Sequence, residues 1–203
     1  MAMLTHELKT SLALIRFASR NALGKSQSGA RIEQAVDDIN AVIERCQQAD
    51  KLEKGWSFSK QSHSVITLVQ NCLDRLEHQD RVQVSDLPNL TISTDGALFC
   101  IILHNLLENA LKYSPPGDKV QLHAKVLENP ARLSLVVTNR IGNAGAPDRQ
   151  RVFDKYYRSE RALSTTGSGL GLYIVQALTQ LFGGQVDYHH EGETVAFSMI
   201  LPT

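Results

Sequence analysis

The sequence predicts an α+β fold in which an antiparallel helical hairpin precedes a two-layer α/β sandwich. Residues 1–54 contain no Pro, Trp or Tyr, and their apolar side chains recur at helical spacing. In residues 55–203, short stretches in which apolar and polar residues alternate are mixed with stretches of amphipathic helical spacing. This mixture is typical of strands and helices packed in two layers. We therefore expect two domains, 1–54 and 55–203.

Composition and charge narrow the class of protein. The 203 residues carry 21 Lys and Arg against 21 Asp and Glu, so the net charge of zero argues against a nucleic-acid surface. The 42% hydrophobic content is sufficient for a packed core, and the apolar runs are too short to span a bilayer. The N-terminus does not resemble a signal peptide. The three cysteines, Cys46, Cys72 and Cys100, are widely spaced at apolar positions, so we expect reduced thiols that act as small core residues.

The hairpin is predicted from two apolar stripes on either side of a polar turn over residues 24–29, and Gly55 is expected to end the second helix. The stripes are formed by Leu4, Leu8, Ile15 and Ala22, then by Ile32, Val36, Ile39, Ile43 and Cys46. Two helices cannot enclose a core alone, whereas a second copy would complete a four-helix bundle. We therefore expect a homodimer.

The second domain is predicted to contain strands and three helices. Asp95 is the expected N-cap of the central helix, and Gly183 and Gly184 close the last one. The expected helices span 65–77, 95–112 and 171–182, and the expected strands span 56–60, 81–85, 90–93, 120–127, 132–138, 185–190 and 194–201.

Several polar clusters stand out against these elements. They are His6-Glu7-Leu8-Lys9-Thr10, the run from Asn105 to Ser114, the run from Phe153 to Arg158, and Gly167-Ser168-Gly169-Leu170-Gly171-Leu172. In this order they resemble the H, N, F and G2 boxes of the sensor histidine kinases of two-component systems. The resemblance covers essentially the whole chain, and it implies a dimeric phosphoacceptor bundle followed by an ATP-binding domain of the GHKL (Bergerat) type.

The resemblance assigns His6 as the phosphoacceptor, and a neutral imidazole is a nucleophile near neutral pH. Glu7 would orient the ring or take its proton. Thr10 lies one helical turn further on the same face, where the family implies a role in dephosphorylating the partner regulator. Ser11 replaces the family's usual Pro, so we expect a milder bend below His6.

The N box is implied to hold the phosphates and their cation. Asn105 and Asn109 lie one helical turn apart, and two amide oxygens on one helix face suit Mg²⁺ with its waters. Lys112 would reach a phosphate as a point charge, and Tyr113 would border the nucleotide.

The glycine-rich G2 box is expected to approach the phosphates closely. Its glycines, Gly167, Gly169 and Gly171, avoid a Cβ, and the following helix offers free N–H groups. Ser168, Leu170 and the F-box Arg158 are assigned to the same site by the resemblance. Residues 140–168 form the implied lid, and residues 140–166 carry six basic against three acidic side chains.

The G1 box departs from the family pattern. Asn139 stands where an Asp accepts a hydrogen bond from the adenine amino group, with Gly145 and, less regularly, Gly142 as the glycines that follow. An Asn carbonyl still accepts, but a charge-assisted bond is about twice as strong as a neutral one. We therefore expect weaker or less adenine-selective ATP binding.

The resemblance implies an ATP-dependent protein-histidine kinase that phosphorylates His6, passes the phosphoryl group to an Asp of a response regulator, and also acts as that regulator's phosphatase. One alternative is a degenerate kinase that acts mainly as a phosphatase or docking scaffold. Another is a non-kinase ATPase of the mismatch-repair or chaperone type, although Asn105 cannot act as the general base that those enzymes have there. The expected setting is the cytoplasmic portion of a sensor whose membrane anchor lies outside this chain.

Overall fold

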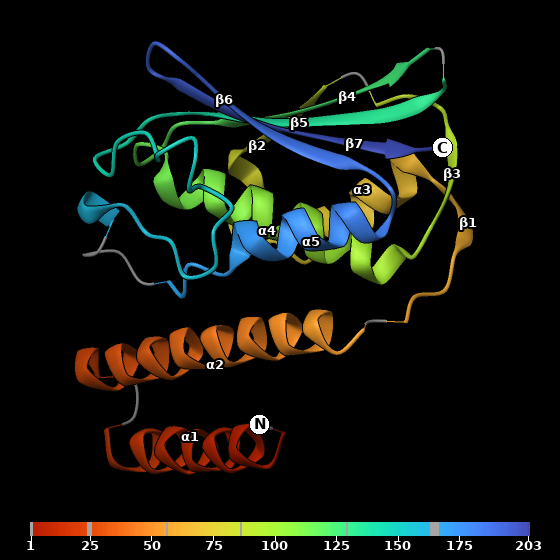
Figure 1. The fold of residues 1–203 in the computed structure, drawn as a ribbon. Helices are drawn as coiled ribbons and strands as arrows, with labels where there is room; N and C mark the ends of the chain where they lie inside the picture. The colour runs from red at the N-terminus through yellow and green to blue at the C-terminus, as the bar shows by residue number, and fades with distance from the viewer. Residues whose placement is uncertain (1, 24–25, 56, 86, 129, 163–166) are drawn as a thin grey trace.

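The structure, a computed structural model, describes residues 2–23, 26–55, 57–85, 87–128, 130–162 and 167–203. For residues 2–7, 22–23 and 38 the description covers the backbone alone. Figure 1 shows four levels, from the sheet through a layer of helices to α2 and then α1.

The N-terminal hairpin consists of α1 (Ala2–Leu23) and α2 (Gln27–Glu53). The Ser26 hydroxyl accepts a hydrogen bond from the Gly29 amide at 3.1 Å, so α2 begins inside the stretch that the sequence predicts to be a turn. Lys54 caps the end of α2, and Gly55 follows with a φ of +87°, as expected for a helix terminator. Within the described residues, no helix is both long enough and apolar enough to cross a membrane.

The hairpin has a small core of its own. Leu12, Val36 and Ile43 are buried together, and Ile32 packs against them. Ion pairs cross the outside of the hairpin, among them Arg16–Asp37 at 3.0 Å and Arg20–Glu33 at 2.5 Å. Such exposed pairs contribute little to stability, about 0–1 kcal/mol each.

The sheet of the second region is mixed and has the strand order β2-β4-β5-β7-β6. Only β2 and β4 are parallel among these neighbours, and the other pairs are antiparallel. The strands are β2 (Val82–Ser85), β4 (Val120–Leu127), β5 (Arg132–Arg140), β6 (Gln185–Glu191) and β7 (Thr194–Pro202). Burial alternates along β7, so one face of the sheet is covered and the other is less so.

The covered face packs against α3 (Val65–Leu73), α4 (Gly96–Tyr113) and α5 (Gly171–Leu181) (Figure 1). The Asp95 carboxylate accepts from the amides of Ala97 and Leu98, which confirms it as the N-cap of α4. A short antiparallel ribbon, β1 (Gln61–Ser64) with β3 (Thr91–Thr94), closes one end. The α+β class and the two-layer arrangement are thus confirmed.

Two element predictions need correction. The strand expected at 56–60 is wrong over 57–60, because the pairing with β3 begins only at Gln61; Trp56 lies outside the described residues. The helix expected at 65–77 ends at Leu73, and turns follow it. Two 3₁₀ turns, Gln79–Arg81 and Glu160–Ala162, were not expected from the sequence.

The prediction of reduced thiols holds for Cys46 but was wrong for Cys72 and Cys100. Cys72 on α3 and Cys100 on α4 form a disulfide, with their Cα atoms 5.3 Å apart, whereas Cys46 is a free thiol. Both cysteines face the shared apolar interior, as the sequence indicates, but spacing in sequence says nothing of their proximity in space. The disulfide joins the two helices across a sequence separation of 28.

Helix α2 takes part in both cores. Its N-terminal half packs with α1 through Val36 and Ile43, while Ala49 is buried in the large core of the second region. Cys46 and Leu52 pack against that large core as well, and α2 runs alongside α5 (Figure 1). The packing therefore crosses the sequence position at which we expected one domain to end.

Candidate nucleotide-binding site

A cavity lies between α4, the N-terminus of α5, the end of β5 and the irregular segment that follows it. Its empty volume is about 970 Å³, including space open to solvent. Most residues that the sequence assigns to nucleotide binding line this cavity: Asn105, Asn109, Lys112, Tyr113, Asn139, Gly145, Arg158, Gly167, Ser168, Gly169 and Gly171.

The two amides of α4 enter the cavity at different depths. Asn105 is 8% exposed, and its Nδ2 donates to the Ile101 carbonyl at 2.8 Å. That bond fixes the amide and directs Oδ1 towards Gly171, where a Cβ would lie only 2.9 Å from this oxygen. Asn109, one turn later, is less buried. Helix α4 therefore offers one constrained amide oxygen and a second, more accessible amide on the same wall.

Of the glycines in the 167–171 segment, Gly169 lies closest to neighbouring backbone, whereas a Cβ at Gly167 or Gly171 would meet the side chain of Lys112 or Asn105. Gly169 has a φ of +69°, and a Cβ there would lie 2.7 Å from the Tyr156 carbonyl carbon. The Gly169 carbonyl also accepts from the Tyr156 amide at 3.0 Å. The segment is thereby held against the turns of the F box while α5 presents its first amides to the cavity, a geometry suited to phosphate oxygens.

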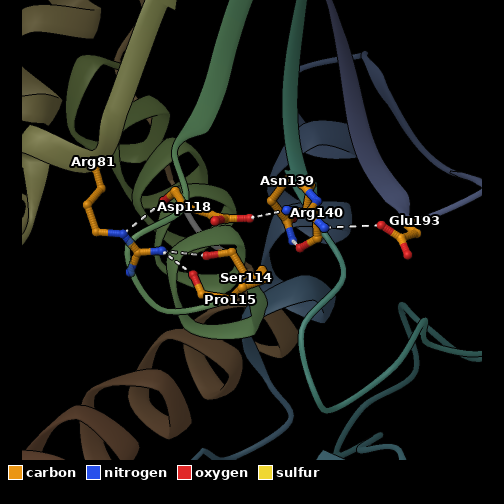
Figure 2. A network of polar contacts seen from close by, with 7 residues as sticks. All are labelled: Arg81, Ser114, Pro115, Asp118, Asn139, Arg140 and Glu193. Atoms are coloured by element: carbon orange, nitrogen blue, oxygen red, sulfur yellow. Dashed lines mark hydrogen bonds and ion pairs between the residues drawn. The ribbon is translucent and has the colours of Figure 1, made fainter.

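Arg81 holds the C-terminal end of α4 in place (Figure 2). Its guanidinium donates to the Ser114 hydroxyl at 2.7 Å and to the carbonyls of Pro115 and Asp118 at 3.1 and 3.0 Å. Cations at a helix C-terminus interact favourably with its unpaired carbonyls. Arg81 therefore positions Lys112 and Tyr113, which precede the bonded residues in the last turn.

Asn139 lies at the end of the apolar row of β5 that faces the helices. It follows Leu133, Leu135 and Val137 at alternate positions and is 4% exposed. Its Nδ2 donates to the Arg140 carbonyl at 2.7 Å (Figure 2). Because a carbonyl can only accept, the amide nitrogen is used there, and Oδ1 is the acceptor that this side chain has for a ligand.

The cavity is lined by three cationic side chains and by the carboxylate of Glu108, which pairs with one of them. Arg45 comes from α2, Lys112 from α4 and Arg158 from the segment before the 3₁₀ turn. Burial raises the pKa of Tyr113, and the positive charges of Arg158 and Arg45 oppose that shift. The Lys112 ammonium also lies over the Tyr113 ring, 5.1 Å from its centroid. Such a site favours an anionic ligand that carries an aromatic or apolar group.

Two of the predicted binding residues are not part of the wall. Leu170 is fully buried in the large core, so its side chain anchors the start of α5. Gly142 donates its amide to the Tyr113 carbonyl at 2.8 Å, and a Cβ there would lie 2.7 Å from the same oxygen. Gly142 therefore joins the loop after β5 to the end of α4 and is not itself in the cavity lining.

The residues predicted for phosphotransfer lie on α1, away from the residues that line the cavity. The helix continues without interruption through Ser11, where the family usually has Pro. Thr10 follows His6 by four residues on this helix and is exposed. The side chains of His6 and Glu7 lie outside the described part of the chain, so their roles stay predictions.

Sequence reasoning missed three residues of the site. Arg45 lies on a helix that was assigned only to the bundle, Arg81 acts from outside every motif, and Tyr157 was noted only as part of the F box. The Tyr157 hydroxyl accepts from the Asp148 amide at 2.9 Å, which ties down the loop on the far side of the cavity. Tyr157 stands beside Arg158 in the F box, a signal that could have identified it.

The described residues contain no cluster of three or more His, Cys, Asp or Glu side chains that could hold a metal ion. A cation in this cavity would thus depend on amide oxygens, waters and the oxygens of a bound ligand. Mg²⁺ commonly binds in this way, with few protein ligands and several from phosphates and water.

The fold and the cavity define a nucleotide-binding α/β sandwich attached to a helical hairpin. Residues 94–203 match the family model described as histidine kinase-, DNA gyrase B- and HSP90-like ATPase, and the chain belongs to that family. The match begins at the end of β3 and includes all of α4, α5 and the cavity segments between them.

Curated relatives of the whole chain are sensor histidine kinases. HprS of Escherichia coli is 25% identical over 98% of this chain, and SenX3 of Mycobacterium tuberculosis is 29% identical over 99%. The aligned regions cover 46% and 52% of those proteins, so the chain spans about half the length of the relatives it matches.

Solved structures share the fold. ShkA in complex with AMPPNP has a TM-score of 0.74 at 24% identity, covering 99% of this chain and 45% of that one. Acinetobacter baumannii AdeS has a TM-score of 0.70 at 18% identity, covering 97% of both chains. The chain therefore has the family and the fold of a sensor histidine kinase catalytic core.

Proposed function

We propose that this chain is an ATP-dependent protein-histidine kinase that phosphorylates its own His6. The observation that carries the proposal is the cavity, where the α4 amides, the glycine segment before α5 and three cationic side chains converge. The close approach of Gly171 to Asn105 leaves no room for a Cβ between them. The named relatives, all sensor kinases, support the same activity.

In the proposed reaction an imidazole nitrogen of His6 attacks the γ-phosphorus of ATP. A nitrogen–phosphorus bond forms, the bond from that phosphorus to the β-phosphate oxygen breaks, and ADP leaves. Glu7 orients the ring or takes its proton. The cavity's part is to hold the triphosphate in place and to neutralise its charge, which supplies most of the catalysis in phosphoryl transfer.

Within the cavity we assign the phosphates to the side formed by Lys112, Gly167–Gly171 and the first amides of α5. Asn105 and Asn109 would hold Mg²⁺, which draws charge from the phosphate oxygens when bound. The base would lie towards Asn139, whose free acceptor is Oδ1, and Tyr113 would border it. Arg158 and Gly145 belong to the opposite wall.

We also propose that the active form is a homodimer. Leu8, Ile15 and Ile39 are 46–49% exposed although they lie beside the buried residues of the hairpin core. Burying a side chain of this size gains about 1.5–3 kcal/mol, so these residues favour contact with a second hairpin. A bundle of four helices would bury them.

The proposed partner is the receiver domain of a response regulator, which would accept the phosphoryl group on an Asp. Leu14 and Phe17 are 65% and 66% exposed and follow Thr10 at helical spacing, so they share its face of α1. An exposed apolar patch beside polar groups is typical of a protein-docking surface. Thr10 would assist the reverse reaction, dephosphorylation of the regulator.

We place the whole protein at a membrane through segments outside this chain, with this part in the cytoplasm.

A second candidate function is a degenerate kinase that binds ATP weakly and acts as a phosphatase or scaffold. Asn139 favours this function, because a neutral amide replaces the family's carboxylate and its Nδ2 donates to the Arg140 carbonyl. A non-kinase ATPase is less well supported, since Asn105 cannot accept a proton from water.

Incubation with γ-labelled ATP and Mg²⁺ separates these functions. The kinase proposal expects label on the protein that is acid-labile, alkali-stable and absent from His6→Gln. Nucleotide binding without label favours the scaffold or phosphatase. Release of free phosphate that persists in His6→Gln would indicate an ATPase. A His104→Gln variant is the matched control, because His104 lies on α4 with a hydrogen bond to the Cys72 carbonyl.

A further inference from the structure

Arg45 reaches the nucleotide cavity from the helical hairpin. It belongs to α2, yet it lines the cavity together with Asn105, Asn109 and Lys112. Its Nη2 donates to Oε2 of Glu108 at 2.5 Å, and its side chain is 24% exposed. The guanidinium therefore lies at the cavity edge, on the same side as the α4 amides.

A phosphate group can replace Glu108 as the hydrogen-bond partner of Arg45. Glu108 also lines the cavity, with a side chain 46% exposed, and its other oxygen is 3.9 Å from His104 Nδ1. Carboxylate and phosphate oxygens present the same geometry to a guanidinium, which binds either with two parallel hydrogen bonds. A bound polyphosphate would thus compete with Glu108 for Arg45.

The backbone of Arg45 is fixed by the packing of α2. The next residue, Cys46, packs against the large core, and Ala49 is buried in it one turn later. A second ion pair, between Glu53 and Lys155, holds the C-terminal end of α2 to the segment before α5. Arg45 can therefore stay in the cavity only while the hairpin remains docked in this way.

We propose that Arg45 binds the terminal phosphate of the nucleotide, exchanging Glu108 for phosphate oxygens, and so couples ATP occupancy to docking of the helical hairpin. This rests on the proposed function for the identity of the nucleotide. The other cavity cations, Lys112 and Arg158, belong to the second region and bind phosphate whether or not the hairpin is docked. Of these three cations, only Arg45 belongs to α2 and moves with it. By thermodynamic linkage, ATP binding stabilises the docked arrangement by the same free energy by which docking strengthens ATP binding.

The test measures dissociation constants of the full chain for ATP, ADP and adenosine with Mg²⁺, by calorimetry or by displacement of a fluorescent nucleotide. Arg45→Ala should weaken ATP binding by about tenfold or more, the usual scale for losing a hydrogen bond to a charged group. ADP should be affected less and adenosine unchanged, so the ATP/ADP preference falls. Arg45→Lys should recover part of the ATP/ADP preference, because an ammonium keeps the positive charge but lacks the two parallel N–H donors of a guanidinium.

Glu108→Gln supplies the opposite prediction. It removes the competing carboxylate, so ATP should bind more tightly than to the wild type while adenosine binding stays the same. Arg16→Ala is the matched control, since Arg16 pairs with Asp37 within the hairpin and is not among the residues that line the cavity. It should leave all three constants unchanged.

Equal weakening of ATP, ADP and adenosine by Arg45→Ala would overturn the inference, since that is the result of a general loss of structure. An unchanged ATP/ADP preference, or a wild-type chain that binds no ATP, would overturn it as well. Absence of phosphate on His6 with an ATP/ADP preference that depends on Arg45 would instead contradict only the kinase proposal.

Discussion

The two regions of this chain bury their apolar residues to very different extents. In the described residues, the hairpin core contains three buried residues, Leu12, Val36 and Ile43, while apolar side chains such as Ile15 and Phe17 remain about half to two-thirds exposed. The second region has a continuous core from α3 through the sheet, joined by a disulfide. The difference supports our proposal that the hairpin is the part of the chain that contacts a second copy.

Helix α2 connects the two regions by packing into both. Its first half completes the hairpin and its last turns belong to the large core, so the boundary in composition at residues 54 and 55 is not a boundary in packing. Arg45 lies where the two halves meet. The contrast between the two regions can be tested with substitutions made in one region at a time.

Breaking the Cys72–Cys100 disulfide should have the largest effect on stability, and only in the second region. A disulfide of this loop length contributes about 2–4 kcal/mol, so its loss should lower the Tm by roughly 5–15 °C. Calorimetry of Cys100→Ala measures the shift, and Cys46→Ser, at the free cysteine, is the control. An unchanged Tm would show that this link does not set the region's stability.

Gly169→Ala should next impair the cavity while leaving the hairpin intact. The added Cβ would lie 2.7 Å from the Tyr156 backbone, so the segment must shift from its place in the cavity wall, and nucleotide affinity should fall by roughly tenfold or more. Gly192→Ala has a similar positive φ in open space and should leave affinity unchanged. Equal effects of the two variants would assign the loss to backbone strain alone.

Ile39→Glu should weaken the dimer without changing the second region. Burying the exposed half of Ile39 gains about 0.75 kcal/mol in each protomer, and both protomers lose it, so the dimer dissociation constant should rise by about tenfold. Sedimentation equilibrium measures it. The same charge placed on the other exposed face, in Phe17→Glu, should leave the constant unchanged; a rise there too would argue that both faces are dimer contacts.

Asn139→Asp should have the smallest effects, which are opposite in sign: stability should fall and ATP affinity should rise. The carboxylate cannot donate to the Arg140 carbonyl, which costs about 1 kcal/mol and should lower the Tm by about 3 °C. It should also bind the adenine amino group more strongly, so ATP affinity should rise by several-fold. Asn143→Asp, an exposed site on the same loop, controls for charge. Unchanged ATP affinity would argue against the contact between Asn139 and the base.

Local patterns predicted most of the fold. Asp95 and Gly55 marked helix ends because capping depends on neighbouring residues, and the alternation of 194–201 predicted β7. The strand expected at 57–60 failed because alternation does not reveal which residues have a pairing partner. The disulfide was missed for a related reason, since it depends on proximity in three dimensions.

The site divides in the same way. Residues within motifs, such as Asn105 and Gly169, could be placed at the cavity from sequence, whereas Gly142 lies outside its lining and approaches Tyr113. Arg45 and Arg81 could not be found, because each comes from a distant segment and matters only through a contact made in the folded chain.

The central claim is that the cavity of one region supplies a phosphoryl group to the hairpin. Mass spectrometry of the full chain after incubation with ATP and Mg²⁺, with digestion at neutral to alkaline pH, tests it most directly. The account predicts a phosphoryl group on His6 and none in Asn109→Ala, which removes the amide oxygen and whose fold should be intact because the side chain is only partly buried. Phosphate on another residue, or ATP consumed with His6 unmodified, would contradict it.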